Sequence, residues 1–209
     1  PESCSNVLIE NCYFSTGDDC IAIKSGRNND GRLWSQPSEN IIVRNCEMKN
    51  GHGGVVIGSE ISGGYKNLFV ENCRMNSPLL DRVIRIKTNT LRGGTIQNIY
   101  VRNIEVGVCK EAILHISLLY EPREIGERGF HPVVQNINLE YIRSQKSQYG
   151  VSIDALPDTT CVRDIFVRNC NFNGVKSGNK LTGKIENVKF DNLTVNGKLM
   201  ETYPLKKKN

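Results

Sequence analysis

Apolar and polar residues alternate in a short stretch that recurs seven times along the chain. Each copy begins with Asn or Asp, and successive copies start 23 to 38 residues apart. Alternation with a period of two is typical of a half-buried β-strand. The copies are NVLIENC (6–12), NIIVRNC (40–46), NLFVENC (67–73), NIYVRNI (98–104), NINLEYI (136–142), DIFVRNC (164–170) and NVKFDNL (187–193).

A second apolar stretch follows most copies at a nearly constant distance. CIAIKSG, GVVIGSE, AILHISL and GVSIDAL each start 14 residues after the first residue of a copy, and VIRIKTN starts 16 residues after Asn67. This spacing predicts at least two short strands per repeat, joined by a turn of nearly fixed length, with variable insertions elsewhere. Long helical periodicity is missing from the chain.

The fixed offset favours an all-β solenoid, a right-handed parallel β-helix. A β-sandwich would not keep the same offset from unit to unit, and a leucine-rich repeat would need another leucine spacing. Cysteines fill the seventh position of four copies, and asparagines fill the first position of six. Both sets are predicted to form columns along the stack, with buried thiols and bonded amides, because neighbouring coils lie ~4.8 Å apart. The thiol column consists of Cys12, Cys46, Cys73 and Cys170, and the amide column of Asn6, Asn40, Asn67, Asn98, Asn136 and Asn187.

Composition adds limits to this solenoid. The 209 residues suffice for one domain with a sizeable core. A net charge of +5 suits an acidic partner. No stretch approaches the ~20 apolar residues that span a bilayer, and the final lysines 206–208 indicate a solvated tail. We therefore predict a single domain over residues 1–204 and a basic tail over residues 205–209, with neither a membrane nor a nucleic-acid partner.

The stretch STGDDCIAIKSG (15–26) places two acids directly before the second strand of its coil. Asp18 and Asp19 precede CIAIKSG, and His52 precedes GVVIGSE at the same register in the next coil. These residues are therefore expected to be stacked neighbours. Paired acids separate their pKa values, which gives one protonated acid and one carboxylate at the same pH. Glycoside hydrolysis needs such a pair, and a nearby histidine can tune the acid.

Cations extend this patch over the same strands. If the isoleucines of CIAIKSG and VIRIKTN point inward, Lys24, Arg85 and Lys87 point outward. Arginine binds a carboxylate with a planar fork and lysine acts as a point charge, so an acidic sugar polymer is the natural substrate class. We predict no metal and no cofactor, because His52, His115 and His131 lie in different coils without metal-ligand spacing.

TGDDCIAIKSG, GHG (51–53) and RIK (85–87), in this order on a β-helical repeat, resemble the polygalacturonases of glycoside hydrolase family 28. The resemblance implies inverting hydrolysis of α-1,4-galacturonan in pectin. By position, Asp18 resembles the general acid, Asp19 one of two water-activating acids and His52 the supporting histidine. Arg85 and Lys87 resemble galacturonate-binding cations.

Further parts of the chain carry the resemblance into later coils. Tyr120 resembles a substrate-binding tyrosine, by a looser match. SGRNNDGRLW (25–34) and GHGGVVIGSE (51–60) resemble bacterial, exo-acting members. The resemblance also implies a secreted or periplasmic protein.

The family's Asn-Thr-Asp motif, which supplies the other water-activating acid, does not occur in this sequence. The chain is therefore expected to be the C-terminal portion of a longer enzyme, without its early coils. We expect these residues by themselves to be weak or inactive, and to associate through the exposed first coil.

Two alternatives remain open. A pectate-lyase-like enzyme on the same fold would use β-elimination with Ca²⁺ held by several carboxylates, and one acid pair with a histidine suits that scheme poorly. A non-catalytic carbohydrate-binding β-helix is the other alternative, since a fold does not imply activity.

Overall fold

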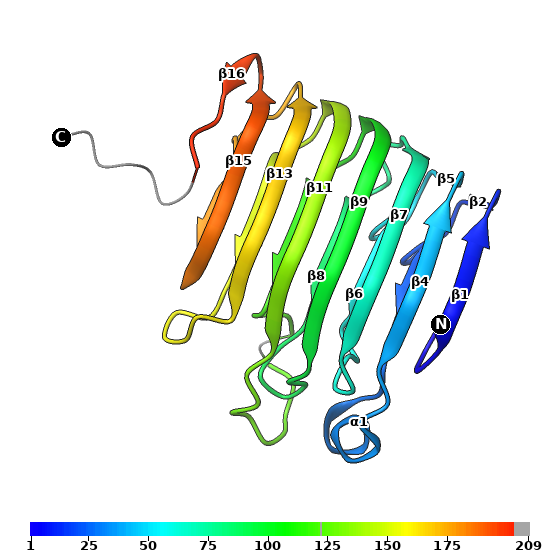
Figure 1. Ribbon diagram of the computed structural model, residues 1–209, viewed down its shortest axis with the longest axis vertical. Coiled ribbons are helices and arrows are strands. Elements are labelled where there is room, and N and C mark those ends of the chain that lie inside the picture. Colours follow the sequence, from blue (N-terminus) through cyan, green and yellow to red (C-terminus); the bar gives the residue numbers. More distant parts are fainter. Residues whose placement is uncertain (122, 203–209) are drawn as a thin grey trace.

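The protein is described here by a computed structural model that covers residues 1–121 and 123–202. Its strands stack side by side from the first coil to the last (Figure 1). The predicted basic tail at 205–209 lies outside the described residues. Across the described ranges, no helix combines the length and the apolar character needed to cross a bilayer.

The seven recurring stretches form one wall of the molecule. Their main strands pair in the order β1-β4-β7-β9-β11-β13-β15, all parallel, and the terminal β16 adds to β15 in the antiparallel sense. The bounds are β1 Ser5–Glu10, β2 Tyr13–Phe14, β4 Ser38–Arg44, β5 Glu47–Met48, β7 Tyr65–Met75, β9 Thr95–Val108, β11 Val133–Lys146, β13 Val162–Phe172, β15 Ile185–Val195 and β16 Lys198–Leu199. The predicted first strands of the repeat are thus confirmed.

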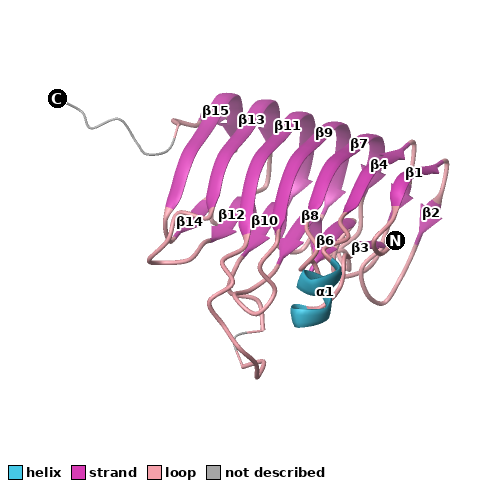
Figure 2. Cartoon of the chain, turned by 60° about the horizontal axis from the view of Figure 1, so that its bottom comes forward, coloured by secondary structure: helices cyan, strands magenta, loops and turns pink. Residues whose placement is uncertain are grey.

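The second strands of the repeat form the opposite wall, which Figure 2 shows beneath the first. Their order is β14-β12-β10-β8-β6-β3, again parallel throughout. The bounds are β3 Ile21–Ile23, β6 Val55–Gly58, β8 Arg82–Lys87, β10 Ala112–Ser117, β12 Tyr149–Asp154 and β14 Lys180–Thr182. Two parallel sheets wound from alternating strands make a parallel β-helix, as the constant offset predicts. The right-handed sense is the one that crossovers between parallel strands adopt.

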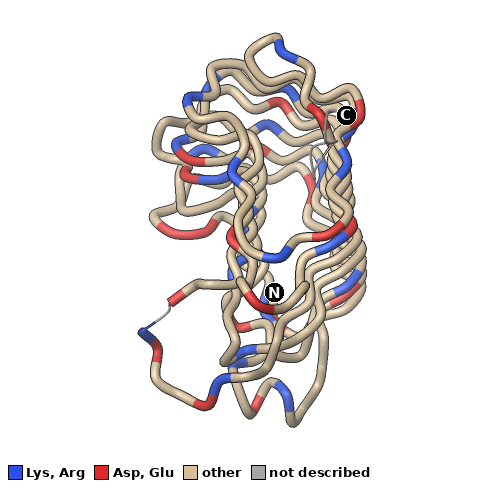
Figure 3. Tube along the Cα trace, turned by 90° about the vertical axis from the view of Figure 1, so that its left-hand side faces the viewer, with Lys and Arg blue, Asp and Glu red and all other residues tan. Residues whose placement is uncertain are grey.

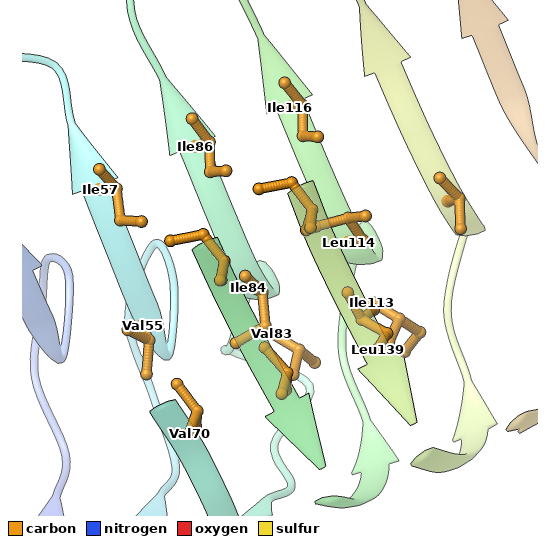
Figure 4. Packing of buried hydrophobic residues seen from close by; sticks show 14 of the residues in the cluster. Val55, Ile57, Val70, Val83, Ile84, Ile86, Ile113, Leu114, Ile116 and Leu139 are labelled. Carbon is orange, nitrogen blue, oxygen red and sulfur yellow. The ribbon is translucent and has the colours of Figure 1, made fainter. Parts of the chain in front are cut away.

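The core fills the space between the two walls. On β8, Ile84 and Ile86 are fully buried, and each pairs with an aliphatic residue of β6 and of β10 (Figure 4). Ile21 and Ile23 of β3 continue the same two columns and are at most 4% exposed. The prediction that these isoleucines point inward is confirmed, and it leaves the alternate side chains of β3, β6 and β8 on the outer face.

Asparagine columns mark the bends of each coil. Asn67 donates to Asn40 over 2.8 Å, and Asn98 donates to Asn67 over 3.0 Å, which confirms the bonded amides that the sequence predicts. These residues have φ near +60°, a conformation that Asn adopts more readily than most residues. A second column with the same backbone conformation was not predicted. It consists of Asn11, Asn45, Asn72, Asn103, Tyr141, Asn169 and Asn192.

The cysteine column is buried along most of its length. Cys46, Cys73 and Cys170 are at most 3% exposed, and burial raises the pKa of the Cys73 thiol to about 11. Cys12 is exposed, so the prediction of a buried thiol is wrong at that position. In the described residues no coil packs on the outer side of β1, and Cys12 therefore lacks the cover that its counterparts have. All eight cysteines are free thiols.

Opposite charges alternate along the outer face of the first wall. Glu10, Arg44, Glu71 and Arg102 occupy one register position of consecutive strands. Arg44 contacts Glu10 at 2.7 Å and Arg102 contacts Glu71 at 2.6 Å. Figure 3, viewed along the stack, shows blue and red positions along both walls and in the insertions. Ion pairs between neighbouring coils thus link four consecutive strands of this face in two pairs.

Insertions project from one edge of the solenoid, as the variable spacing predicts. The first carries a helix that the sequence did not predict, α1 (Asn28–Trp34), and the second is the segment between β10 and β11 (Figure 2). A seven-residue helix is too short to be stable alone. Contacts to the second insertion and to the turn after β8 hold it in place.

Candidate active site

The predicted site residues come from three consecutive coils and one later strand end. Asp18 and Asp19 lie in the turn before β3, His52 lies before β6, and Arg85 and Lys87 lie on β8. When the second strands are aligned by their first residues in the sequence, Arg85 falls beside Val56 and Lys87 beside Gly58, and the register confirms both pairs. Most of these residues line or border a pocket of about 290 Å³. Its lining comprises Asp18, Asp19, Ala22, Lys24, Ser59, Glu60, Lys87, Tyr120 and Glu121.

Asp18 and His52 are in direct contact. The Nδ1 atom of His52 lies 2.9 Å from Oδ1 of Asp18, and a carboxylate only accepts, so this ring nitrogen is assigned as the donor. The backbone N–H of His52 also donates to the carbonyl of Asp18 over 3.1 Å. The Asp18 side chain is 80% exposed. It therefore stands at the mouth of the pocket with its orientation fixed by the next coil.

Asp19 has the opposite environment. Its side chain is only 7% exposed and lies 2.8 Å from Nζ of Lys87 and 3.7 Å from Nη1 of Arg85. The lysine contacts Oδ2, whereas the buried Oδ1 has no hydrogen-bond partner in the described structure. Asp18 is thus solvated, whereas Asp19 is held between two cations and has one oxygen without a hydrogen-bond donor.

The electrostatics of Asp18 differ from the sequence-based expectation. The pKa of its carboxyl lies below the usual value, because the Asp19 backbone N–H donates to it over 2.8 Å and the His52 ring donates as well. Desolvation works in the opposite direction, and the hydrogen bonds together outweigh it. The local environment of Asp18 therefore favours its carboxylate form, and its role as the general acid stays a prediction.

Two glycines explain how adjacent coils approach so closely here. A Cβ on Gly51 would lie 2.1 Å from the carbonyl oxygen of Asp18, and its φ is +129°. A Cβ on Gly58 would lie 2.0 Å from the carbonyl oxygen of Lys87, with φ at +99°. Neither position accepts another residue without displacing the backbone that carries the acid or the cation.

Arg85 and Lys87 are less accessible than the sequence suggests. They leave the core as predicted, yet each side chain is only 9% exposed. Asp19 pairs with both, and the ring of Tyr120 lies 5.3 Å from Nζ of Lys87 and 5.5 Å from Cζ of Arg85. Tyr120 is thus placed beside the cations, where the looser match puts a substrate-binding residue.

Lys24 lines the pocket and binds a residue that sequence reasoning missed. Its Nζ contacts Oε2 of Glu60 at 2.5 Å, and Glu60 lines the pocket together with Glu121. Glu60 ends the quoted run GVVIGSE, so its register was visible in the sequence. Glu121 lies in an insertion without a repeat pattern, and no sequence signal pointed to it.

The two acids and the histidine offer donor atoms of the kind that bind metal ions. One donor atom each from Asp18, Asp19 and His52 lies within 4.8 Å of the others. The ammonium group of Lys87 already occupies Asp19, and a cation at that position opposes a divalent ion. The donor set therefore suits acid–base chemistry better than metal binding.

Two curated proteins are similar in sequence to most of this chain. A "Probable polygalacturonase" of Vitis vinifera is 31% identical over 166 residues, which cover 75% of this chain and 32% of that relative. An "Exo-poly-alpha-D-galacturonosidase" of Dickeya chrysanthemi is 25% identical, covering 91% of this chain and 36% of that protein. The chain thus spans about a third of the length of these curated relatives.

Solved structures agree in fold. A hyperthermoactive exopolygalacturonase from Thermotoga maritima superposes with a TM-score of 0.87 at 36% identity, covering 96% of this chain and 44% of that one. A family 28 exopolygalacturonase of Yersinia enterocolitica has a TM-score of 0.60 at 20% identity and supports the fold alone. The family model described as "Glycosyl hydrolases family 28" matches residues 1–189. The chain therefore belongs to glycosyl hydrolase family 28, the polygalacturonase family that its motifs resemble.

Proposed function

We propose that this chain carries the general acid and one water-activating acid of an enzyme that hydrolyses α-1,4-galacturonosidic linkages in polygalacturonan. The observation that carries the proposal is the contrast between the two acids. Asp18 is exposed at the pocket mouth and held by His52, whereas Asp19 is buried between Lys87 and Arg85. Two carboxyl groups in different environments are what acid and base roles require.

Asp18 delivers a proton to the glycosidic oxygen of the leaving sugar as that bond breaks. Its low pKa in the open pocket does not oppose this role, since a bound sugar displaces water and desolvation raises the pKa of a carboxyl. The contact with His52 returns a proton to Asp18 after each turnover. Asp18 is thus reprotonated by His52, which does not contact the bond being cleaved.

Asp19 orients the attacking water. Its Oδ1 is unpartnered but buried, so the water reaches it only when Arg85 and Lys87 turn toward the substrate carboxylate. The water gives a proton to the base and bonds to the anomeric carbon. Inverting enzymes place their two carboxyl groups ~6.5–9.5 Å apart, whereas oxygens of Asp18 and Asp19 lie within 4.8 Å. An inverting attack therefore requires the water on the far side of Asp19, shared with a further carboxylate from outside these 209 residues.

Lys87, Arg85 and Lys24 supply the positive charge that an acidic sugar needs. Each is paired with an acid of the protein, so binding of a uronate exchanges one carboxylate partner for another. Tyr120 contributes a ring beside the same cations. A galacturonate carboxylate fits this set better than a neutral sugar does.

The first test is the chemistry of the products. The complete protein is expected to release reducing ends from polygalacturonate without generating ultraviolet-absorbing unsaturated uronides, and a chelator is expected to leave the rate unchanged. The 209 residues alone should act far more slowly, because they hold two of the three acids. Unsaturated products or strong chelator sensitivity would favour a lyase. Galacturonan binding by the complete protein without turnover would favour the binding-module alternative.

The second test is the position of cleavage, which we propose to be at chain ends. Glu60 and Glu121 place carboxylates in the pocket lining beside the insertions, where they oppose a further uronate and can accept bonds from terminal hydroxyls. Early digestion should therefore yield short products while the viscosity of the polymer stays high. A rapid fall in viscosity before short products accumulate would contradict exo action.

A further inference from the structure

Three segments outside the regular coils meet at one buried arginine. Arg92 follows β8 and is fully buried, although it carries a positive charge. The start of α1 lies on one side of it, and the segment that follows Tyr120 lies on the other. A buried guanidinium destabilises the fold unless it is paired. The partners of Arg92 therefore show which segments it connects.

Glu124 is the principal partner of Arg92. Nη1 of the arginine donates to Oε1 of Glu124 over 2.9 Å, and Nη2 lies 2.8 Å from Oε2. Nη1 also donates to Oδ1 of Asn28 over 2.5 Å, at the first residue of α1. The hydrogen bond from Arg92, with a smaller contribution from Arg27, lowers the pKa of Glu124 to about 2. Arg92 therefore joins both insertions to the end of β8.

The same cluster reaches the pocket through the backbone of Tyr120. Asn89 donates to the carbonyl oxygen of Tyr120 over 2.9 Å, and its amide also lies 3.4 Å from Oε2 of Glu124. The backbone N–H of Tyr120 donates to the carbonyl oxygen of Thr88 over 3.1 Å. Thr88 comes directly after Lys87. Backbone and side-chain hydrogen bonds thus link Lys87 of the pocket, the buried Arg92–Glu124 pair and Tyr120.

We propose that Arg92 and Glu124 form a positioning pair that fixes Tyr120 as the wall of the substrate pocket. Arg92 does not line the pocket. It acts through Glu124, which Asn89 also contacts, and through Glu121 of the pocket lining, whose Oε2 lies 3.7 Å from its Nη2. This inference rests on the proposed function for its kinetic consequence only. The placement of Tyr120 is a property of the protein without substrate.

The alternative is that the pair only secures the insertions, with no effect on the pocket. The two ideas differ in what a change of Glu124 does to Tyr120. If Tyr120 is positioned by the pair, loosening the pair weakens substrate binding only while the Tyr120 ring is present. If the pair is merely structural, the effect of the change does not depend on the ring.

The experiment is a double-mutant cycle in the complete protein with Glu124→Gln and Tyr120→Ala. Glu124→Gln keeps the shape of the side chain but removes the charge. We expect it to raise KM for a galacturonate trisaccharide about tenfold and to change kcat less than about twofold. In the Tyr120→Ala background the same change should alter KM less than about twofold.

Arg27→Ala is the matched control, because Arg27 binds the same Glu124 from a position that is 60% exposed. An exposed partner contributes little, so KM should stay within about twofold of the unchanged protein. An unaltered KM for Glu124→Gln, or an equal rise in both backgrounds, would overturn the proposal. If Glu124→Gln does not fold, Asn89→Ala is judged by the same criteria.

Hydrogen exchange without substrate separates this inference from the proposed function. The Tyr120 amide should exchange faster in Glu124→Gln than in the unchanged protein, since its bond to Thr88 is then less protected. Unaltered exchange would overturn the positioning role whatever the enzyme hydrolyses. Failure of the unchanged protein to hydrolyse galacturonan would overturn the proposed function, and the exchange result would still decide the role of the pair.

Discussion

Asp18→Asn is expected to reduce hydrolysis of polygalacturonate by the complete protein by ~10²–10⁴-fold, the usual contribution of a general acid. The amide has the shape of the carboxyl and retains a contact with His52, but it cannot deliver a proton. Substrate binding should be preserved, because Lys87 and Arg85 are untouched. Initial rates of reducing-end release and the dissociation constant of a galacturonate trisaccharide measure the two effects separately.

Asp164→Asn is the control for that substitution. Asp164 occupies the bend column in which the other coils carry asparagine, and its carboxylate accepts from Asn187. An amide at this position can take part in the same column, so the rate should stay within about twofold. Near-normal hydrolysis by Asp18→Asn would show that another group is the acid and would refute the role proposed for Asp18.

Ile84→Ala is expected to lower the free energy of unfolding of the chain by ~2–5 kcal/mol, the range seen for truncation of large buried aliphatic residues. Ile84 is fully buried on β8, paired with Val55 on one side and Leu114 on the other. Those neighbours belong to rigid strands of adjacent coils, so the cavity cannot collapse easily. Urea denaturation measures the shift in midpoint and the slope.

Ile125→Ala provides the comparison with the same residue type. Ile125 is 96% exposed, in the insertion between β10 and β11. Its truncation should change the free energy of unfolding by less than about 0.5 kcal/mol. A small effect of Ile84→Ala, similar to that of Ile125→Ala, would contradict the placement of the Ile84 side chain in the core.

The stacking of the acids with the cations was predictable because the second strands share an apolar pattern by which they can be aligned. That alignment, more than the distance from the first strand, sets which residues of successive coils are neighbours, since the coil with Arg85 and Lys87 has a longer turn. It places Arg85 beside Val56, Lys87 beside Gly58 and His52 near Asp18, as the structure shows. The asparagine column followed from the same kind of alignment.

Residues in the insertions could not be placed in this way. Glu121, Glu124 and helix α1 lie in segments without a repeat, and the sequence gives no register for them. Arg92 follows a strand but meets a partner 32 positions further along the chain. Such contacts depend on how two irregular segments fold over each other.

The sequence by itself determined the coil, because alternating side chains must point alternately into the core and away from it. It also determined which of the proposed catalytic and substrate-binding groups share a face. Only the tertiary structure decided how those groups are solvated: Asp18 exposed, Asp19 buried between cations, and Cys12 uncovered. Solvation and ion pairing depend on every neighbour in space, and most of the neighbours around the pocket come from other coils and from the insertions.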